Sequence, residues 1–243
     1  MGSQERRERE KNELRGKILS AARELFAERG VEAVTMRAIA QRIEYTATAI
    51  YFHFKDKADL LSALLTEDFI LLAAQFHEIA EISDPIERLR RAATAYVRFG
   101  HTHPNQYRLM FMTPIVETAV EGPVPIEKGS CANDAYAFLQ QMVSDAADAG
   151  VLRDELVDRE LVCQLFHSTL HGIVSMRIAH GPGTVQAKSK HIEWRATEDL
   201  LELACNAMFA GTIKEKALRE WQRKHRAPST RTTQAIKGKR KAT

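Results

Sequence analysis

Residues 35–57, TMRAIAQRIEYTATAIYFHFKDK, constrain the fold more than any other part of the chain. Thr35 is a suitable N-cap, because its hydroxyl can accept a hydrogen bond from a free backbone N–H at the start of a helix. Apolar residues then recur at the spacing of a helix about two turns long, at Met36, Ile39, Ala40 and Ile43. After a three-residue connection, Thr46 can cap a second short helix. Two short helices joined so closely predict a helix-turn-helix.

The second helix of this unit has two different sides. Its predicted apolar side is formed by Ala49, Ile50 and Phe54. The opposite side carries Ala47, Thr48, Tyr51 and either Phe52 or His53. Small methyl and hydroxyl groups would let the helix lie deep in a major groove of DNA, with base contacts at its N-terminal end.

Donor side chains that suit phosphate oxygens are concentrated directly after this helix. Tyr51, His53, Lys55 and Lys57 lie within seven residues, and such donors position a protein on DNA without selecting a sequence. Asp56 is the expected N-cap of the following helix. The residues predicted to contact DNA are Thr35, Arg37, Thr46, Ala47, Thr48, Tyr51, His53, Lys55 and Lys57.

A third helix is predicted upstream of this pair. Its apolar face is marked by Leu14, Ile18, Ala21, Ala22, Leu25 and Phe26, and it ends at Gly30, which can adopt a positive φ. Together, residues 17–61 resemble the DNA-binding domain of the TetR family of transcriptional regulators. The resemblance rests on ILSAARELFAERG, TMRAIA, IYFHF and KDKADLL. It implies a three-helix unit that reads a palindromic operator.

The sequence departs from the family pattern in two places. Glu44 and Tyr45 stand in the turn, where the family usually has Gly and a small apolar residue, and Ala47 stands where a Lys is usual. The first departure affects the turn geometry, and the second removes an expected contact to DNA. A second reading therefore stays open, in which this is a helical metal- or small-molecule-binding protein without specific DNA binding.

Charge divides the chain into three parts. Lys and Arg number 12 against 9 Asp and Glu in residues 1–57, 12 against 21 in residues 58–213, and 11 against 2 in residues 214–243. An acidic body would be repelled by DNA, so the duplex should meet the N-terminal part. We therefore predict a DNA-binding domain at 12–61, a ligand-binding and dimerisation domain at 62–213, and a disordered basic tail at 214–243. The tail is either a solubilising end or a nonspecific contact to phosphates.

The body is expected to be helical throughout, which gives an all-α fold. Helices are predicted at 56–81, 85–101, 104–112, 131–149, 158–179 and 192–211, with a loop at 113–130. The last two helices either pack within the core of their own chain or form a four-helix dimer interface. A homodimer is favoured, because a dimer places two recognition helices on a palindrome.

The middle of the chain carries a second, partial resemblance. YVRFGHTHPNQYRLMF at 96–111, followed by Leu170, His171 and Gly172, is similar to the ligand-binding domain of a TetR subgroup named for a Trp-His-Gly motif, with Leu170 in place of Trp. This implies a helical pocket for a small-molecule effector, and an apolar or aromatic one is favoured. Its predicted lining is Phe99, Tyr107, Met110, Phe111, Phe138, Met142, Phe166, His167 and His171.

Other functional classes receive little support. His167 and His171 have metal-binding spacing, but the segment HSTLH lacks the Glu of a zinc-protease helix, and no nucleophile elbow, P-loop or dinucleotide motif is present. No catalytic role, metal or cofactor is expected.

Cys131, Cys163 and Cys205 are far apart and odd in number, which favours reduced thiols. No apolar run is long enough to cross a membrane, and the charged N-terminus favours a cytoplasmic location.

These features predict a ligand-responsive, sequence-specific DNA-binding regulator. A repressor is preferred over an activator: without effector the dimer fits its operator, and effector binding in the acidic domain favours a different spacing of the recognition helices.

Overall fold

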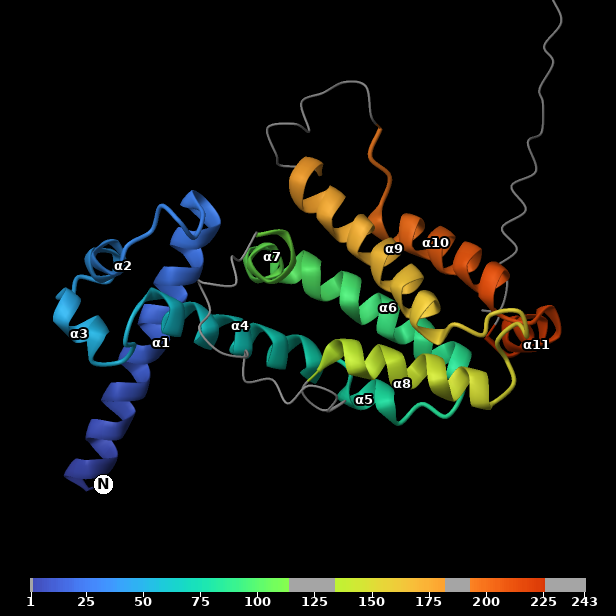
Figure 1. Ribbon diagram of the computed structural model, residues 1–243, viewed down its shortest axis with the longest axis horizontal. Helices are drawn as coiled ribbons and strands as arrows, with labels where there is room; N and C mark the ends of the chain where they lie inside the picture. The colour runs from blue at the N-terminus through green and yellow to red at the C-terminus, as the bar shows by residue number, and fades with distance from the viewer. Residues whose placement is uncertain (1, 114–133, 182–192, 226–243) are drawn as a thin grey trace, which may run out of the picture.

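The computed structural model describes residues 2–113, 134–181 and 193–225. These residues form helices joined by short connections, with one isolated β-bridge between Leu152 and Ile213, so the predicted all-α fold is confirmed. A small N-terminal unit lies at one end and a larger helical bundle at the other (Figure 1).

The N-terminal unit contains α1 (Ser3–Arg29), α2 (Met36–Arg42) and α3 (Ala47–Tyr51). Both predicted caps are confirmed: Thr35 Oγ1 accepts from the Ala38 N–H at 3.1 Å, and Thr46 Oγ1 accepts from the Ala49 N–H at 3.3 Å. Gly30 follows α1 with φ +79°. The core of the unit consists of buried apolar side chains from the three helices, including Ile18, Ala22, Leu25, Ile39 and Ile50.

The unusual turn between α2 and α3 has a defined geometry. Glu44 has φ +60°, and it is the one non-glycine residue in the described ranges with a positive φ. The Tyr45 N–H donates to the Ala40 carbonyl at 2.9 Å, and the Glu44 N–H donates to the Gln41 carbonyl at 3.2 Å. These two bonds form a Schellman motif, in which the position of Glu44 normally favours Gly. The turn is therefore a regular helix end that carries a strained residue.

The long helix α4 (Lys57–Ala74) begins in the N-terminal unit and ends in the bundle. Asp56 is its N-cap, as predicted, and accepts from the Asp59 N–H at 2.9 Å. The predicted helix at 56–81 is too long, because α4 ends at Ala74 and the separate short helix α5 (His77–Ala80) follows a turn. The boundary at 61/62 lies inside α4, so the two domains share one continuous helix.

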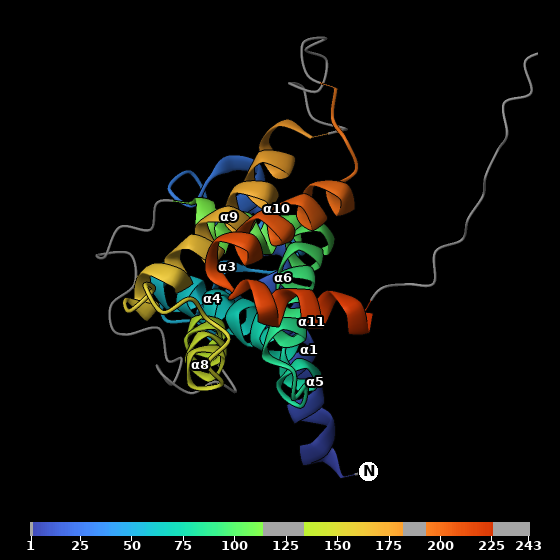
Figure 2. The same ribbon diagram turned by 90° about the vertical axis from the view of Figure 1, so that its right-hand side faces the viewer.

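The bundle contains α6 (Pro85–Thr102), α7 (Pro104–Tyr107), the π-helix η1 (Arg108–Met112), α8 (Ala135–Asp148), α9 (Arg159–His180) and α10 (Thr197–Thr212). Helices α9 and α10 run side by side (Figures 1 and 2). α6 packs closely on α9, because a Cβ at Gly100 would lie 2.3 Å from Val174 Cγ1. Most of the predicted loop at 113–130 lies outside the described residues.

The expectation of a tail disordered from residue 214 is wrong for its first part. Residues Glu215–His225 form the helix α11. Its Trp221 is buried, with its ring 6.1 Å from that of Phe209 and the Arg90 guanidinium 5.7 Å above it. One large aromatic anchor orders a helix whose average composition is polar, and composition alone did not reveal it. Residues 226–243 lie outside the described part.

Candidate DNA-binding surface and ligand cavity

The recognition helix α3 presents a mixed polar and aromatic surface to solvent. Thr48 is exposed, and Tyr51 and Phe52 are 53% and 77% exposed. Ile50, on the opposite side, is fully buried and holds the helix on its domain. Ala47 was placed on the exposed side by its sequence position, but it is half-buried and packs against the core. Ala47 is the first residue of α3, directly after the turn from α2, and there its methyl group faces the core.

The other predicted DNA contacts have different surroundings. Thr35 and Thr46 are exposed caps, and Arg37 and Lys55 are also exposed. Lys57 is half-buried, and its ammonium donates to the Val31 carbonyl at 3.1 Å. That bond fixes the start of α4 to the connection after α1, so part of the donor capacity of Lys57 is used inside the domain.

His53 lies half-buried at the end of the recognition helix. Burial lowers the pKa of its imidazole, and the positive charges of Lys11 and Arg15 lower this pKa further. A neutral imidazole can still donate one hydrogen bond to a phosphate oxygen. Arg15 also lies 5.3 Å above the ring of Phe54. Lys11 and Arg15 were not among the residues predicted for this surface, because α1 is distant from it in the chain.

Two ion pairs join α1 to α4. The guanidinium of Arg23 donates to both oxygens of Asp68, at 2.9 and 3.3 Å, and Asp68 is only 1% exposed. Burial raises the pKa of this carboxyl, and Arg23 opposes the rise. Nearer the DNA-binding end, Arg15 donates to Glu67 at 2.5 Å. The N-terminal unit is thus attached to the first helix of the bundle by packing and by a bidentate pair.

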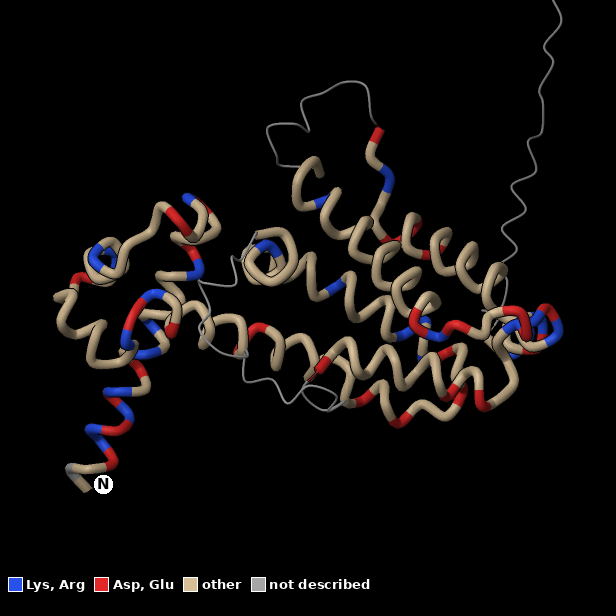
Figure 3. Tube along the Cα trace, in the orientation of Figure 1, with Lys and Arg blue, Asp and Glu red and all other residues tan. Residues whose placement is uncertain are grey.

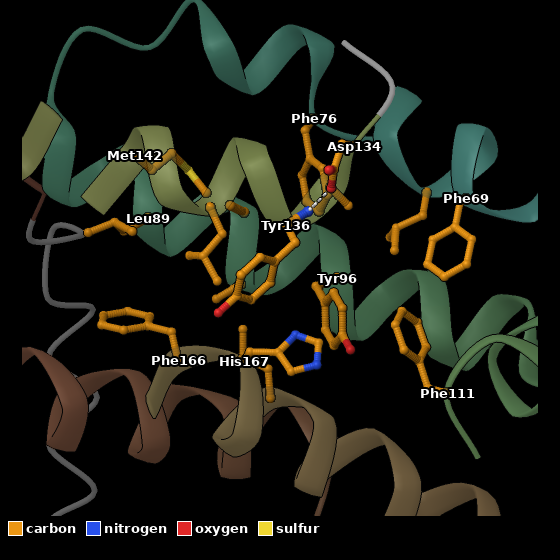
Figure 4. Close-up of a pocket in the computed structure, with 16 residues that line it drawn as sticks. Phe69, Phe76, Leu89, Tyr96, Phe111, Asp134, Tyr136, Met142, Phe166 and His167 are labelled. Atoms are coloured by element: carbon orange, nitrogen blue, oxygen red, sulfur yellow. Dashed lines mark hydrogen bonds between the residues drawn. The ribbon is translucent and has the colours of Figure 1, made fainter. Parts of the chain in front are cut away.

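A cavity of about 180 Å³ lies between α4, η1, α6, α8 and α9 (Figure 4). Its wall is mostly apolar and aromatic and consists of Phe69, Leu72, Phe76, Leu89, Ala92, Ala93, Tyr96, Phe111, Asp134, Ala135, Tyr136, Leu139, Met142, Phe166, His167 and Leu170. Four residues of the predicted lining are among them: Phe111, Met142, Phe166 and His167. The predicted lining and this cavity therefore overlap in part, and most of the wall residues were not among those predicted.

The five other predicted residues do not line this cavity. Phe99, Met110 and Phe138 are buried in the surrounding core, and the ring of Phe138 stacks on that of Phe76 at 5.3 Å. Tyr107 is fully buried, and its hydroxyl lies 2.9 Å from the Tyr96 hydroxyl and 2.8 Å from His171 Nδ1. Tyr107 and His171 therefore form a layer behind the wall, where they hold Tyr96 in place.

Residues missed by the sequence analysis supply several of the polar groups of the wall. Tyr96 continues the spacing of Leu89, Ala92 and Ala93 along one face of α6, and this periodicity marks it as buried without assigning it to the cavity wall. Tyr136 donates to Glu160 at 2.5 Å. In Figure 4 the rings of Tyr96, Tyr136 and His167 lie around the same space.

The side chains that line the cavity favour an uncharged ligand. Burial lowers the pKa of His167, and the neighbouring His171, with its ring stacked at 6.0 Å, lowers it further. Burial also raises the pKa of Tyr96, so both groups are neutral near pH 7. The lining contains the carboxyl of Asp134 but no Lys or Arg. A compact apolar molecule with one hydrogen-bonding group fits this wall better than an anion.

A second, wider cavity of about 610 Å³ has a different character. It lies beside α6, α7, α9 and the start of α10, and its wall includes His101, Arg108, Arg177 and Arg195. Arg177 also lies 5.2 Å above the ring of Trp194. This more polar cavity is separate from the aromatic one, since the two share no lining residue.

The structure describes the surroundings of His167, His171, Cys163 and Cys205, the residues considered for metal or redox chemistry. Within 2–113, 134–181 and 193–225, no group of three or more His, Cys, Asp or Glu side chains is arranged to hold a metal ion. Cys163 and Cys205 are buried free thiols, and burial raises the pKa of each to about 11. Cys131 lies outside the described residues. None of the described helices has the length and apolar character needed to cross a membrane.

Comparisons with known proteins agree with this architecture. Residues 18–64 match the family described as "Bacterial regulatory proteins, tetR family", and residues 89–198 match "Tetracyclin repressor-like, C-terminal domain". The transcriptional activator FasR of Mycolicibacterium smegmatis is 29% identical over 133 residues, which cover 54% of this chain and 61% of FasR. The transcriptional repressor KstR2 of Mycobacterium tuberculosis is 35% identical over 80 residues, which cover 32% of this chain and 40% of KstR2. The matched regions thus span less than two thirds of either relative.

Solved structures show the same fold over most of the chain. The ketosteroid transcriptional regulator KstR2 of Mycobacterium tuberculosis superposes with a TM-score of 0.63 at 22% identity, covering 83% of this chain and 95% of that one. SmeT, the repressor of a Stenotrophomonas maltophilia multidrug efflux pump, gives a TM-score of 0.58 at 20% identity, covering 84% and 92%. The two domain matches and this shared fold lead to one assignment: the chain belongs to the TetR family of bacterial regulatory proteins.

Proposed function

We propose that this protein is a ligand-responsive transcriptional regulator that binds a palindromic DNA operator as a homodimer. The observation that carries the proposal is α3, a short helix that is capped at Thr46, anchored by buried Ile50 and exposed along Thr48 and Tyr51. Such a helix can enter a major groove while its domain stays folded. The regulatory functions named for its relatives FasR and KstR2 support the same reading.

An exposed apolar surface supports the homodimer. Leu161, Leu165 and Met176 on α9 are 61%, 46% and 48% exposed, and Leu203 on α10 is 66% exposed. Large apolar side chains clustered on one pair of helices favour association with a partner. A second copy of the same helix pair would complete a four-helix interface. The two recognition helices would then face two half-sites about one helical turn apart.

The aromatic cavity is the proposed effector site. Phe69 of α4 and Phe111 of η1 both line it, with ring centroids 5.7 Å apart. α4 continues from this wall into the N-terminal unit, where Asp68 is bound to Arg23 of α1. A ligand that separates these two rings would move α4, and α4 would move the recognition helix. The coupling depends only on the difference in ligand affinity between the two arrangements.

A repressor released by its effector is our preferred form of this function. An effector that favours the DNA-incompetent arrangement by about 3 kcal/mol would lower operator affinity by roughly a hundredfold. An activator remains the alternative within the family, since the relative FasR is named an activator. The rival from another class is a small-molecule- or metal-binding protein whose helix-turn-helix no longer recognises a sequence, and Glu44 and Ala47 are the features that motivate it.

The test is selection from random duplex DNA by the purified protein at moderate salt. We expect an enriched palindrome. In a follow-up with that duplex, Tyr51→Phe should weaken binding to all sequences similarly, whereas Thr48→Ala should change the preferred bases. Failure to enrich any sequence would reject specific recognition and favour the rival reading. Enrichment with an unchanged base preference in Thr48→Ala would reject the assigned role of Thr48.

A further inference from the structure

The first helix extends well beyond the part of the chain that the DNA-binding family describes. α1 begins at Ser3, whereas the family match begins at residue 18. The intervening helix is exposed up to Glu13. In Figure 1 it projects past α3 at the end of the molecule that carries the recognition helix. This extension contributes almost nothing to the core, so core packing does not explain it.

Its cations fall into two groups according to their partners. On one side, Arg6 pairs with Glu10 at 3.5 Å and Arg9 pairs with Glu13 at 3.8 Å. Arg7 and Lys11 make no hydrogen bond or ion pair with any residue that the structure describes, and both are exposed. Along this helix the charges alternate in sign (Figure 3). Among the described cations before Leu14, Arg7 and Lys11 are the two without a carboxylate partner.

Helical periodicity places the second pair on the inner side of α1. Arg7 and Lys11 precede Leu14 and Ile18 at spacings of four, three and four residues, so all four lie along one helix face. Leu14 packs on the core and Ile18 is fully buried. The side of α1 that faces the domain near Ile18 therefore continues as a cationic face where the helix emerges.

This inner face lies next to the phosphate-contacting end of the recognition helix. Arg15, one turn after Lys11, has its guanidinium 5.3 Å from the ring centre of Phe54. Lys11 lies close enough to lower the pKa of His53. Glu8 stands three residues before Lys11 and so lies at the edge of the same face, where it has no ion pair with a residue that the structure describes. Lys11 and His53, from two distant parts of the sequence, thus lie near each other, and Arg7 continues the same helix face one turn beyond Lys11.

We propose that the exposed inner face of α1, through Arg7 and Lys11, is a second DNA-contacting element that binds phosphates flanking the base pairs read by α3. From Ile18 to Arg7 the helix extends about 16 Å, which corresponds to roughly five base pairs at about 3.4 Å each. The inference rests on the proposed DNA-binding function but adds contacts outside the helix-turn-helix. Because phosphates carry no sequence information, these contacts raise affinity without changing base preference.

The test compares two double variants of the full-length protein that remove the same charge. Arg7→Gln with Lys11→Gln neutralises the inner face, and Arg6→Gln with Arg9→Gln neutralises the outer side. Glutamine is a good helix former, so both variants should keep α1 helical, which circular dichroism checks. Binding is measured as a function of salt on two duplexes: the selected operator with ten flanking base pairs on each side, and a random-sequence duplex of equal length.

A plot of the logarithm of the association constant against the logarithm of the salt concentration has a negative slope. We expect the inner-face variant to make this slope shallower by about 1.8 for each protomer bound, because each of the two lost phosphate contacts contributes about 0.9. At about 0.1 M salt this corresponds to a loss of roughly tenfold to a hundredfold in affinity, on both duplexes. The outer variant should change the slope by less than half as much. Trimming the operator to its palindrome should remove the difference between wild type and the inner-face variant.

Equal slopes for the two double variants would overturn the inference, because general charge would then explain the effect. A difference that persists on the trimmed operator would also overturn it, since the contacts would not lie in the flanks. These outcomes are separate from the proposed function, which fails if the wild-type protein does not prefer the selected operator over the random duplex. In that case the salt dependence measured on the random duplex alone still shows whether the inner face of α1 or its outer side contacts phosphates.

Discussion

The N-terminal unit and the aromatic cavity are built in opposite ways. Most of the side chains proposed to contact DNA are exposed on or beside short helices, and local caps at Thr35, Thr46 and Asp56 fix those helices. The side chains of the cavity point inward from helices far apart in the chain, and mutual packing fixes them. The first kind of site depends on local sequence, and the second depends on tertiary structure. Changes at the two should therefore have different consequences.

We expect the largest effect from changes at the proposed dimer surface of α9 and α10. Leu161→Asp with Leu203→Asp places two charges on the exposed face of α9 and α10. We expect a folded monomer that binds a palindrome more than about a hundredfold more weakly, because the second half-site no longer benefits from tethering. Light scattering and operator binding check both points.

The control for this change is Ile70→Asp, which places a charge at a residue on α4 that is 45% exposed. It should remain dimeric and bind as the wild type does. If the double variant stayed dimeric, the assignment of the interface to α9 and α10 would be wrong.

The next effect tests the layer behind the cavity wall. Tyr107→Phe removes a fully buried hydroxyl that lies 2.9 Å from Tyr96 and 2.8 Å from His171. Because buried Tyr96 and half-buried His171 both lose their partner, we expect the free energy of unfolding to fall by about 1–3 kcal/mol. Tyr136→Phe, whose hydroxyl donates to exposed Glu160, should cost about 1 kcal/mol or less. Chemical denaturation measures both, and equal losses would contradict the distinction between the layer and the wall.

The turn of the N-terminal unit offers a change in the opposite direction. Glu44 has φ +60° in the Schellman motif that ends α2. Glu44→Gly should stabilise the protein by about 0.5–1 kcal/mol, since the relief of left-handed strain exceeds the entropic cost of glycine. Glu44→Ala keeps the strain and serves as the control. A stability gain in Glu44→Ala as large as that in Glu44→Gly would point to the charge of Glu44 rather than its backbone.

The smallest effect concerns pH and the cavity histidines. Burial lowers the pKa of His167 and His171 below the ordinary value. The unfolded chain therefore binds more protons, so stability is complete above the unfolded pKa of about 6.5 and is lost as the pH falls below it. His167→Leu should lose less stability than the wild type between pH 7 and pH 5 in urea denaturation. His101→Gln, at an exposed position, should follow the wild type, and an unchanged pH dependence in His167→Leu would contradict the assignment.

The same contrast explains what the sequence could predict. Caps, helix periodicity and the Gly30 stop are local signals, and they located α1, α2, α3 and the start of α4. The wall of the cavity depends on how α4, α6, α8 and α9 meet, and periodicity cannot distinguish a wall residue such as Tyr96 from a buried neighbour such as Tyr107. The order of α11 was missed because one buried Trp221 outweighs a polar average composition. Lys11 and Arg15 were missed because only the fold brings them beside His53.

The central claim is that occupancy of the cavity changes operator affinity. The direct measurement is fluorescence anisotropy of labelled operator with the neutral aromatic probes indole and 1-naphthol, using wild type and Ala93→Leu, which fills part of the cavity. We predict that a probe that binds the wild-type protein releases the operator. The Ala93→Leu variant should bind the operator with an affinity that the probe does not change. By linkage, operator binding should weaken probe binding by the same factor. A probe that binds in the cavity and leaves operator affinity unchanged would contradict the account.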